Sequence, residues 1–552
     1  MKNLCRILGT LLVFIFIYSC SDENENENTK VYANFLKDSL EVSSDSGSFI
    51  TPIEFSGTTW SIEMDSDKGF ITHISQEKGG NIDKGHQFNQ IKFYYNGNNT
   101  LYTRKQDVFL INKATGKRSI LSIIQRAKYD GLTITLDPST KYQYVTGFGG
   151  MFMPKIWIGK DGLLNKEDID KMCSSNGLGY NILRLMVYPN EPDWASDVEL
   201  ARYAQQQYGV ILFASPWDCT DALADKITVN GKEYKHLKHD NYGAYAEHLI
   251  RYINYMKSNG VNIYAMSIQN EPDMDFTYWE PSEIVDFIKQ YGPEIRKTGV
   301  NLMAPEACGF SPDYTDPILN DADAFSNTDI FAGHLYQGFI NLSSGYVSAR
   351  HDYISGLYNN KLNGEGKGGW WMTEHYIDDP VIDKNSMYQS YQRWNYSLNN
   401  FAKELHMCMD AYCSAYIYWY LKRHNGGCGL IGNDGIFPVD ENNITKDGYI
   451  LAHYAKYASN MTRIKVSVTN SNVLTTAYMN SSKTEMTIVM LNMSKNAFNG
   501  CISSPIVIKN IKGVESTMND NMIPATINTS ENKKQVSVLI PKISMVSVRL
   551  NL

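Results

Sequence analysis

The chain has 552 residues, is 43% hydrophobic and 12% aromatic, and carries 51 basic and 59 acidic residues. This length predicts roughly two to four domains, each able to bury a core. The net charge of −8 argues against a nucleic-acid binder, for which a basic face is expected. The 37 tyrosines and 9 tryptophans offer flat apolar faces with a polar edge, which suit sugar rings, although most must serve as core residues.

The N-terminus has the pattern of an export signal over residues 1–20. Lys2 and Arg6 precede an apolar run that is too short to span a bilayer, which predicts a secretory signal. The four residues that end at Cys20 resemble a bacterial lipobox, which implies that this cysteine becomes the lipidated N-terminus. The alternative is an ordinary cleaved signal with an incidental cysteine.

Residues 21–30 are acidic and contain no apolar side chain, so we expect a solvated linker. This stretch resembles the acidic export signal of surface-exposed lipoproteins in gut Gram-negative bacteria. The resemblance implies an outer-membrane lipoprotein of the cell envelope, held to the membrane through its lipid and exposed at the cell surface.

The cysteines give no sign of a metal site. Cys5 and Cys20 belong to the signal, and no two of the others have C-x-x-C spacing, so a zinc site is not expected. We predict neither a metal nor an organic cofactor, and we expect buried thiols.

Residues 31–127 have an all-β pattern, in which short apolar runs alternate with clusters of Ser, Gly and Asn. Asn96-Gly97 is a strong hairpin signal. Strands at this spacing predict a small immunoglobulin-like β-sandwich. Residues 60–62 and 122–125 resemble parts of BACON domains, which often precede bacterial glycan-degrading enzymes; this implies either a glycan-binding module or a plain spacer.

After residue 128, strand-like runs alternate with amphipathic helices, which predicts an α/β fold with a (β/α)8 TIM barrel over residues 144–460. The predicted barrel strands are 145–148, 182–186, 210–214, 263–268, 301–304, 330–336, 370–373 and 415–420. Residues 461–552 return to short alternating strands and predict an associated β-sandwich. We expect the strand within residues 128–143 to join this sandwich.

Two carboxylates stand where such barrels place catalytic groups, at the carboxyl ends of strands. Glu271 follows strand four in the segment SIQNEPD, and Glu374 follows strand seven in TEHY. Strands four and seven lie across the barrel mouth from one another, and glycoside hydrolysis needs two carboxylates that flank a bond. The alternative for Glu271 is a turn residue, because Asn-x-Pro-Asp is favourable turn chemistry. We interpret Glu306 as structural and Asp273 as a turn residue.

Residues 267–272 and 373–376 resemble the two catalytic segments of glycoside hydrolase family 30. The other strand ends agree with that family in order, at residues 147–151, 215–217, 305–310, 334–336 and 418–420. The stretch 242–273 looks most similar to the bacterial glucuronoxylanase subfamily. The resemblance covers the barrel and its flanking β-sandwich.

This resemblance implies a retaining mechanism, with Glu271 as acid/base and Glu374 as nucleophile. It implies that Asn270 binds the 2-hydroxyl of the sugar. Arg184, His334 and Tyr336 are expected to support the carboxylate of the nucleophile. The other implied substrate contacts are Trp157, Trp217, Tyr376, Trp419 and Arg423. The alternatives are a buried ion pair for Arg184, a hydrogen-bonded core residue for His334 and a plain wall residue for Trp217.

The choice of glycan is predicted from the segment after strand eight. In the glucuronoxylanases a methylglucuronate branch is held there by a basic pair, which here is Lys422-Arg423. Lys422 stands where Arg is usual, and Lys and Arg are not equivalent at a bidentate carboxylate site. We expect cleavage of the β-1,4-xylan backbone, with or without glucuronate. The alternatives are another family 30 activity, such as β-1,6-glucanase or glucosylceramidase-like β-glucosidase, or a non-catalytic glycan-binding lipoprotein.

Overall fold

A computed structural model of the chain describes residues 30–64, 69–98, 104–126, 131–158, 162–336, 344–363, 367–377, 390–424, 429–432, 439–529 and 533–552. The signal, Cys20 and nearly all of the acidic linker lie outside these residues, so lipidation and surface location stay predictions. Within the described ranges, no helix is long and apolar enough to cross a bilayer. The chain divides into two units, Met1–Lys128 and Tyr129–Leu552.

The first unit contains two β-sheets that share one core around Trp60. In order across the first sheet, the strands are β1 (Tyr32–Phe35), β3 (Gly47–Ser56), β7 (Gln87–Tyr95) and β5 (Ile71–Ile74). Across the second sheet they are β2 (Ser39–Val42), β9 (Arg118–Gln125), β8 (Arg104–Asn112), β4 (Thr58–Met64) and β6 (Lys78–Asn81). This unit is all-β, and its resemblance to BACON domains stays a prediction.

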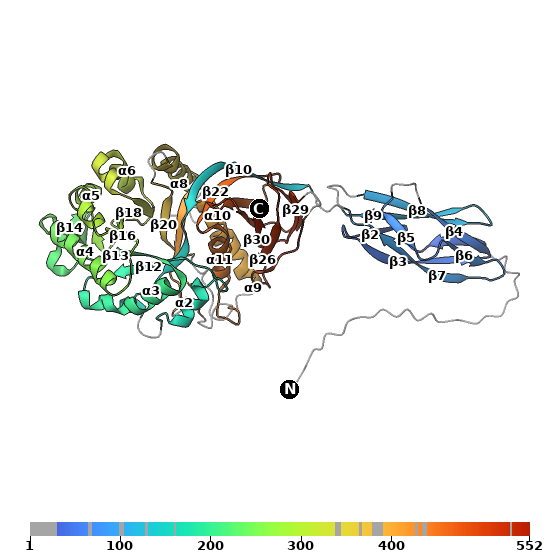
Figure 1. Cartoon of the computed structure of the whole chain (residues 1–552), viewed down its shortest axis with the longest axis horizontal. Helices are drawn as coiled ribbons and strands as arrows, with labels where there is room; N and C mark the ends of the chain where they lie inside the picture. Colours follow the sequence, from blue (N-terminus) through green and yellow to red (C-terminus); the bar gives the residue numbers. More distant parts are fainter. Residues whose placement is uncertain are drawn as a thin grey trace, which may run out of the picture. The chain divides into compact units, whose positions relative to one another are not determined.

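The second unit is built on a closed barrel of parallel strands, which confirms the predicted barrel (Figure 1). In order around it lie β11 (Gly147–Met151), β12 (Ile182–Val187), β13 (Ile211–Pro216), β16 (Ala265–Ser267), β18 (Asn301–Ala307), β19 (Ile330–Gly333), β20 (Trp370–His375) and β21 (Cys413–Tyr418). β21 pairs with β11 and closes the ring. Apolar side chains such as Phe213, Met303 and Trp371 fill the interior, as expected for a packed barrel core.

Helices connect the strands and pack on the outside of the barrel (Figure 1). They are α1 (Lys155–Ile158), α2 (Lys166–Cys173), α3 (Ala195–Tyr208), α4 (Tyr242–Ser258), α5 (Pro281–Arg296), α6 (Pro312–Asn320), α7 (Ala322–Asn327), α8 (Ser344–Leu357), α9 (Ser390–Ser397), α10 (Lys403–Asp410) and α11 (Lys446–Ala458). In α4 the apolar stripe from Tyr245 to Met256 is buried. The helix ends before Gly260, whose φ of 76° suits glycine.

Ten strands form a second sheet beside the barrel. In order they are β27 (Ile523–Pro524), β26 (Asn510–Ser516), β30 (Ser544–Asn551), β24 (Glu485–Asn492), β23 (Val473–Met479), β22 (Met461–Val468), β10 (Leu132–Val145), β25 (Phe498–Ser503), β29 (Gln535–Ile540) and β28 (Ile527–Thr529). Strands from both halves bury one core, and β26 contacts β28, so the sheet folds over on itself. β10 lies in its middle, antiparallel to β22 and parallel to β25.

The sequence interpretation missed a short sheet, whose strands occur in the chain after β13 and before α5. Its strands are β14 (Ala224–Val229), β15 (Lys232–Leu237) and β17 (Thr277–Tyr278). Asn230 and Gly231 connect β14 to β15 with φ values of 51° and 82°, as a tight hairpin turn requires. β17 follows β16 and Glu271 along the chain, so this sheet stands at the end of the barrel that carries the candidate site.

We predict that Gly149→Ala destabilises the barrel unit by about 1–3 kcal/mol or more. A Cβ at this position of β11 would lie 1.7 Å from the backbone oxygen of Ile182 on β12, and a paired strand cannot move away. Urea unfolding measures the effect. Gly356→Ala in α8 is the matched control, since its Cβ would meet only an ordinary contact at 3.6 Å and alanine favours helix. Equal stabilities of the two variants would contradict the prediction.

Candidate active site

A cleft of about 450 Å³ opens at the carboxyl ends of the barrel strands. Its described lining residues are Trp157, Trp217, Glu271, Met274, Phe276, Cys308, Tyr336, Glu374, Tyr376, Trp419 and Tyr420. All of them end barrel strands or follow them along the chain. The lining combines two carboxylates with many aromatic rings, which is the composition expected of a site that binds and cleaves sugars.

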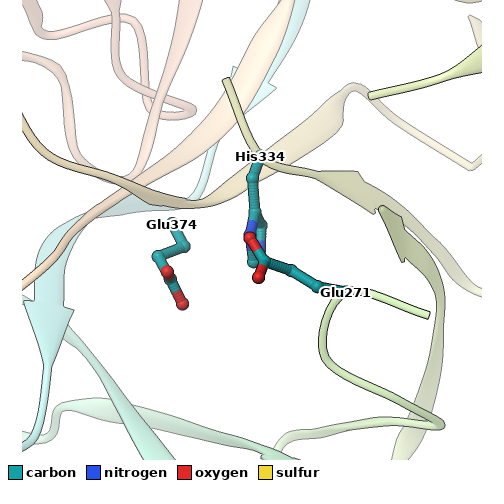
Figure 2. Close-up of side chains that lie close together, drawn as sticks. All are labelled: Glu271, His334 and Glu374. Atoms are coloured by element: carbon teal, nitrogen blue, oxygen red, sulfur yellow. The ribbon is translucent and has the colours of Figure 1, made fainter. Parts of the chain in front are cut away.

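Glu271 and Glu374 face one another across this cleft (Figure 2). One oxygen of each carboxylate lies within 4.8 Å of the other and of a ring nitrogen of His334. Glu271 follows the short strand β16. Glu374 lies within β20, whereas the sequence placed it just after the strand. Both side chains are nearly buried, with 11% and 7% of their surface exposed.

Arg184, on β12, connects the polar groups behind the cleft and is completely buried. Its guanidinium forms ion pairs with Glu374 and with Glu306, the latter at 3.0 Å. It also donates hydrogen bonds to the Asn270 side-chain oxygen and to the Ser215 hydroxyl. Arg184 therefore supports Glu374, as expected, and is a buried ion-pair partner as well; it does not line the cleft.

His334 and Tyr336 follow β19, but they contact different carboxylates. The Tyr336 hydroxyl donates to Glu374 Oε1 at 2.8 Å, as expected. His334 Nδ1 instead hydrogen-bonds Glu271 Oε1 at 2.9 Å, so His334 acts on Glu374 through its charge and not through a hydrogen bond (Figure 2). The chain bends after β19 in a way that directs the two side chains, two positions apart, to opposite carboxylates. His334 is fully buried and does not line the cleft.

Glu271 is held in an uncommon backbone conformation. Its φ is 45°, in the left-handed region, and so is that of Glu306, at 62°. The Glu271 N–H donates to the Glu306 carbonyl at 3.0 Å, which joins the two residues. Asp273, interpreted as a turn residue, accepts a hydrogen bond from the Cys308 N–H at 3.0 Å. Such strained residues persist only where surrounding bonds fix them, and they gather at functional sites.

Burial and neighbouring charges shift the pKa values of this cluster. For Glu306, burial is outweighed by the Arg184 charge and by nearby His334, and the pKa falls to about 2. For His334, burial is outweighed by Glu374 and Glu271, and the pKa rises to about 9. His334 is therefore a cation at neutral pH and Glu306 an anion, and the guanidinium group of Arg184 adds a second positive charge.

The pKa values of Glu271 and Glu374 are shifted in opposite directions. Burial raises the pKa of Glu374, whereas His334 lowers the pKa of Glu271 against the opposing effect of burial. With two cations and the Glu306 anion beside them, the cluster is neutral when this pair carries one negative charge. Burial and repulsion between the carboxylates both oppose a second negative charge, which favours a state in which the pair shares one proton.

An aromatic wall borders the two carboxylates. Trp157, Trp217 and Trp419 contact one another, with ring centroids 5.5–5.9 Å apart. Trp157 is 40% exposed, whereas Trp217 is 2% exposed and stacks on the Arg184 guanidinium at 4.5 Å. Tyr376 also lines the cleft. The structure thus brings together all the aromatic residues that the sequence nominated.

Lys422 and Arg423 do not belong to the described cleft lining. Lys422 Nζ pairs with Asp168 Oδ2 at 2.8 Å and also donates to the Leu163 carbonyl. Arg423 is 5% exposed, and its backbone N–H donates to the Ile431 carbonyl. Contacts with α2 and with the segment around Ile431 hold this pair outside the described cleft lining, and the substrate contact of Arg423 stays a prediction.

Four cleft residues escaped the sequence interpretation: Met274, Phe276, Cys308 and Tyr420. Each follows or ends a strand that had been identified, so position alone could have nominated them. Met274 and Phe276 have no ionisable group, and burial and the charges of Glu271 and Asp273 raise the pKa of the Cys308 thiol.

Glu271, His334 and Glu374 form the one described group of His, Cys, Asp or Glu side chains close enough to share a metal ion. Arg184 is bonded to Glu374, and His334 carries a proton that a metal would have to displace. The two cations already present oppose the binding of a third.

We predict that His334 makes stability depend on pH. Its pKa is higher in the folded chain than the ordinary value of 6.5, so its contribution is complete below about 6.5 and is lost as pH rises through about 9. The difference in free energy of unfolding between wild type and His334→Gln should therefore shrink across this window. Urea unfolding at a series of pH values measures it, with the exposed His239→Gln as control. A constant difference would contradict the prediction.

Comparison with known proteins agrees with the geometry. The family model described as the glycosyl hydrolase family 30 TIM-barrel domain matches residues 180–352. The glucuronoxylanase XynC of Bacillus subtilis (strain 168) is 35% identical over 373 residues, which cover 66% of this chain and 79% of the relative.

Two solved structures are also similar. A GH30 endoxylanase from Clostridium papyrosolvens C71 has a TM-score of 0.62 and 26% identity, and a glycoside hydrolase family 30 subfamily 8 xylanase, Xyn30A, from Clostridium acetobutylicum has a TM-score of 0.61 and 26% identity. Each match covers 76% of this chain and 100% of the other. These similarities confirm the resemblance found in the sequence at the level of the family. The chain belongs to glycoside hydrolase family 30.

Proposed function

We propose that this glycoside hydrolase cleaves the β-1,4-linked backbone of xylan with retention of configuration. The observation that carries the proposal is the closeness of the Glu271 and Glu374 carboxylates, whose nearest paired oxygens lie within 4.8 Å in a cleft lined by aromatic rings. Retaining glycosidases hold their carboxyl groups about 5–5.5 Å apart, whereas inverting enzymes need about 6.5–9.5 Å to admit water. The short separation favours retention. The xylanase relatives supply the choice of substrate class.

In the first step, a Glu374 oxygen attacks the anomeric carbon and the glycosidic bond breaks. The leaving oxygen takes the proton of Glu271, and the sugar remains bound to Glu374 as an ester. In the second step, Glu271 takes a proton from water, the water oxygen attacks the anomeric carbon, and Glu374 leaves. The product keeps the original configuration, and Glu271 regains its proton.

The surrounding residues fit these two roles. Arg184 and Tyr336 donate hydrogen bonds to Glu374, which favours the anion that attacks. The pKa shifts of the site without substrate favour Glu374 as the holder of the shared proton, so the first step requires that Glu271 be protonated when the sugar binds; His334 can pass a proton to Glu271 along the 2.9 Å hydrogen bond. The Asn270 amide nitrogen is buried and has no partner among the described residues, which supports its assignment to the sugar 2-hydroxyl.

We predict that Glu374→Ala lowers activity on xylan by about 10³-fold or more, because no covalent intermediate can form. Glu271→Ala should lose about 10²–10⁴-fold, as expected for a general acid. Azide distinguishes the two: it should give an α-glycosyl azide with Glu374→Ala and a β-glycosyl azide with Glu271→Ala. Glu294→Ala, at an exposed carboxylate of α5, is the control. The same anomer from both variants would refute the assignment.

We also propose that cleavage does not depend on a glucuronate branch. The basic side chain that would begin such a site, Lys422, is paired with Asp168, and no cation is found among the described cleft residues. The carboxylate of a glucuronate branch would lose hydration on entering such a cleft, and no positive charge would offset that cost.

Product analysis tests this choice of substrate. We expect glucuronoxylan and unbranched β-1,4-xylan to be cleaved at rates within about tenfold of one another, which corresponds to less than about 1.4 kcal/mol. β-1,6-Glucan and a β-glucosylceramide serve as the comparison substrates for other family activities. Products from glucuronoxylan alone, each with glucuronate at a fixed position, would refute independence from the branch. No product from any of the four would favour a non-catalytic glycan-binding protein.

A further inference from the structure

We propose that Phe276, braced by the β14–β15 hairpin, binds the sugar that leaves during the first step and thereby selects leaving groups and acceptors. The inference rests on the proposed function and extends it to the departing half of the substrate. Phe276 lines the cleft, and its ring centroid lies 6.2 Å from that of Trp157.

The loop that carries Phe276 starts at the acid/base residue itself. The Met274 N–H donates to the Glu271 carbonyl at 3.0 Å, and the Trp279 N–H donates to the Pro272 carbonyl at 2.9 Å. These bonds close residues 272–279 into a compact loop directly after Glu271. Met274, 40% exposed, and Phe276, two positions on, both line the cleft.

The hairpin fixes this loop from outside the cleft. β15 pairs in parallel with β17, with Lys235 opposite Thr277. Lys232 forms an ion pair with Asp275, the residue before Phe276. The Thr277 hydroxyl, on the residue after Phe276, accepts from the Cys219 N–H at 2.9 Å and donates to Asp218 at 3.2 Å. Both neighbours of Phe276 are therefore held by the segment that follows β13.

A second set of ion pairs holds the β14–β15 hairpin to helix α5. His236 on β15 contacts Asp225 of β14 at 2.7 Å and Glu283 of α5 at 2.9 Å. The hydrogen bond with Glu283 raises the pKa of His236 to about 9, so His236 keeps its charge at neutral pH. The ring of Tyr234 lies 4.9 Å from that of Tyr278 on β17. These contacts fix the position of the loop and therefore of Phe276 at the cleft.

The reaction determines which of the two sugars joined by the glycosidic bond lies next to the loop 272–279. The sugar that stays becomes attached to Glu374, and the sugar that leaves is bonded to the oxygen that Glu271 protonates. The loop of Glu271 is therefore the surface next to the leaving sugar. An aromatic ring without a polar atom offers a sugar an apolar face and does not fix its hydroxyl pattern. The ligand class is an uncharged pyranose at the departing position.

Two substrates of the full-length protein test the inference, a linear xylo-oligosaccharide and β-xylobiosyl fluoride. Both place the same kind of sugar over Glu374, but fluoride leaves no sugar for Phe276 to bind. For Phe276→Ala, we expect the loss of kcat/KM on the oligosaccharide to exceed the loss on the fluoride by about tenfold. Phe276→Tyr keeps the ring face and should narrow that difference. Added xylose-containing acceptors should also capture a smaller share of the intermediate in Phe276→Ala than in wild type.

Equal losses on the two substrates would overturn the inference, because Phe276 would then act on the retained sugar or on the fold. No loss on either would overturn it as well. These outcomes require an active wild type, so they leave the proposed function standing. A wild type inactive on both substrates would overturn the proposed function and, with it, this inference.

Discussion

The ion pair between Arg184 and Glu374 organises the whole end of the barrel. A guanidinium removed completely from water costs several kcal/mol unless good geometry and further hydrogen bonds repay it. Arg184 meets this requirement with two carboxylates, an amide oxygen, a hydroxyl and the face of Trp217. Its partners lie on or directly after β13, β16, β18 and β20, so one buried charge fixes the relative positions of four strand ends.

Because Glu306 takes part of the Arg184 charge, Glu374 does not receive all of it. Burial raises the pKa of Glu374, and the divided Arg184 charge does not reverse that shift, whereas Glu306 stays ionised well into acid. His334 has the matching position beside Glu271. The cluster as a whole sets the number of protons, and the separate contacts of the two carboxylates decide which one receives the proton when substrate binds.

The barrel and the two facing carboxylates could be predicted because they depend on pattern and position. Strand-like runs at regular intervals predict the barrel, and the strand-end rule selects Glu271 and Glu374 from the many carboxylates of the chain. The partner of His334 could not be predicted, because it depends on the direction of one side chain. The ion pair between Lys422 and Asp168 could not be predicted either, because the two residues are 254 positions apart and neither segment has a pattern that indicates the other.

The β14–β15 hairpin marks a different limit. Asn230-Gly231 is a hairpin signal, yet the flanking strands, ADKITV and KEYKHL, mix charged and apolar residues without the sustained alternation that identifies a half-buried strand. Their stability comes from ion pairs and from pairing with β17, which are contacts that a local pattern does not contain. Elements held by long-range polar contacts shape this cleft, and they are the ones that sequence patterns detect least well.

The position of β10 has a consequence for how this enzyme can be inherited. The strand precedes the barrel in the chain but lies in the middle of the ten-stranded sheet, between β22 and β25, which follow the barrel. A gene fragment that began at β11 would therefore encode a sheet with its centre missing. Recombination can exchange the first unit as a cassette, whereas barrel and sheet must be transmitted together, from β10 to the last strand.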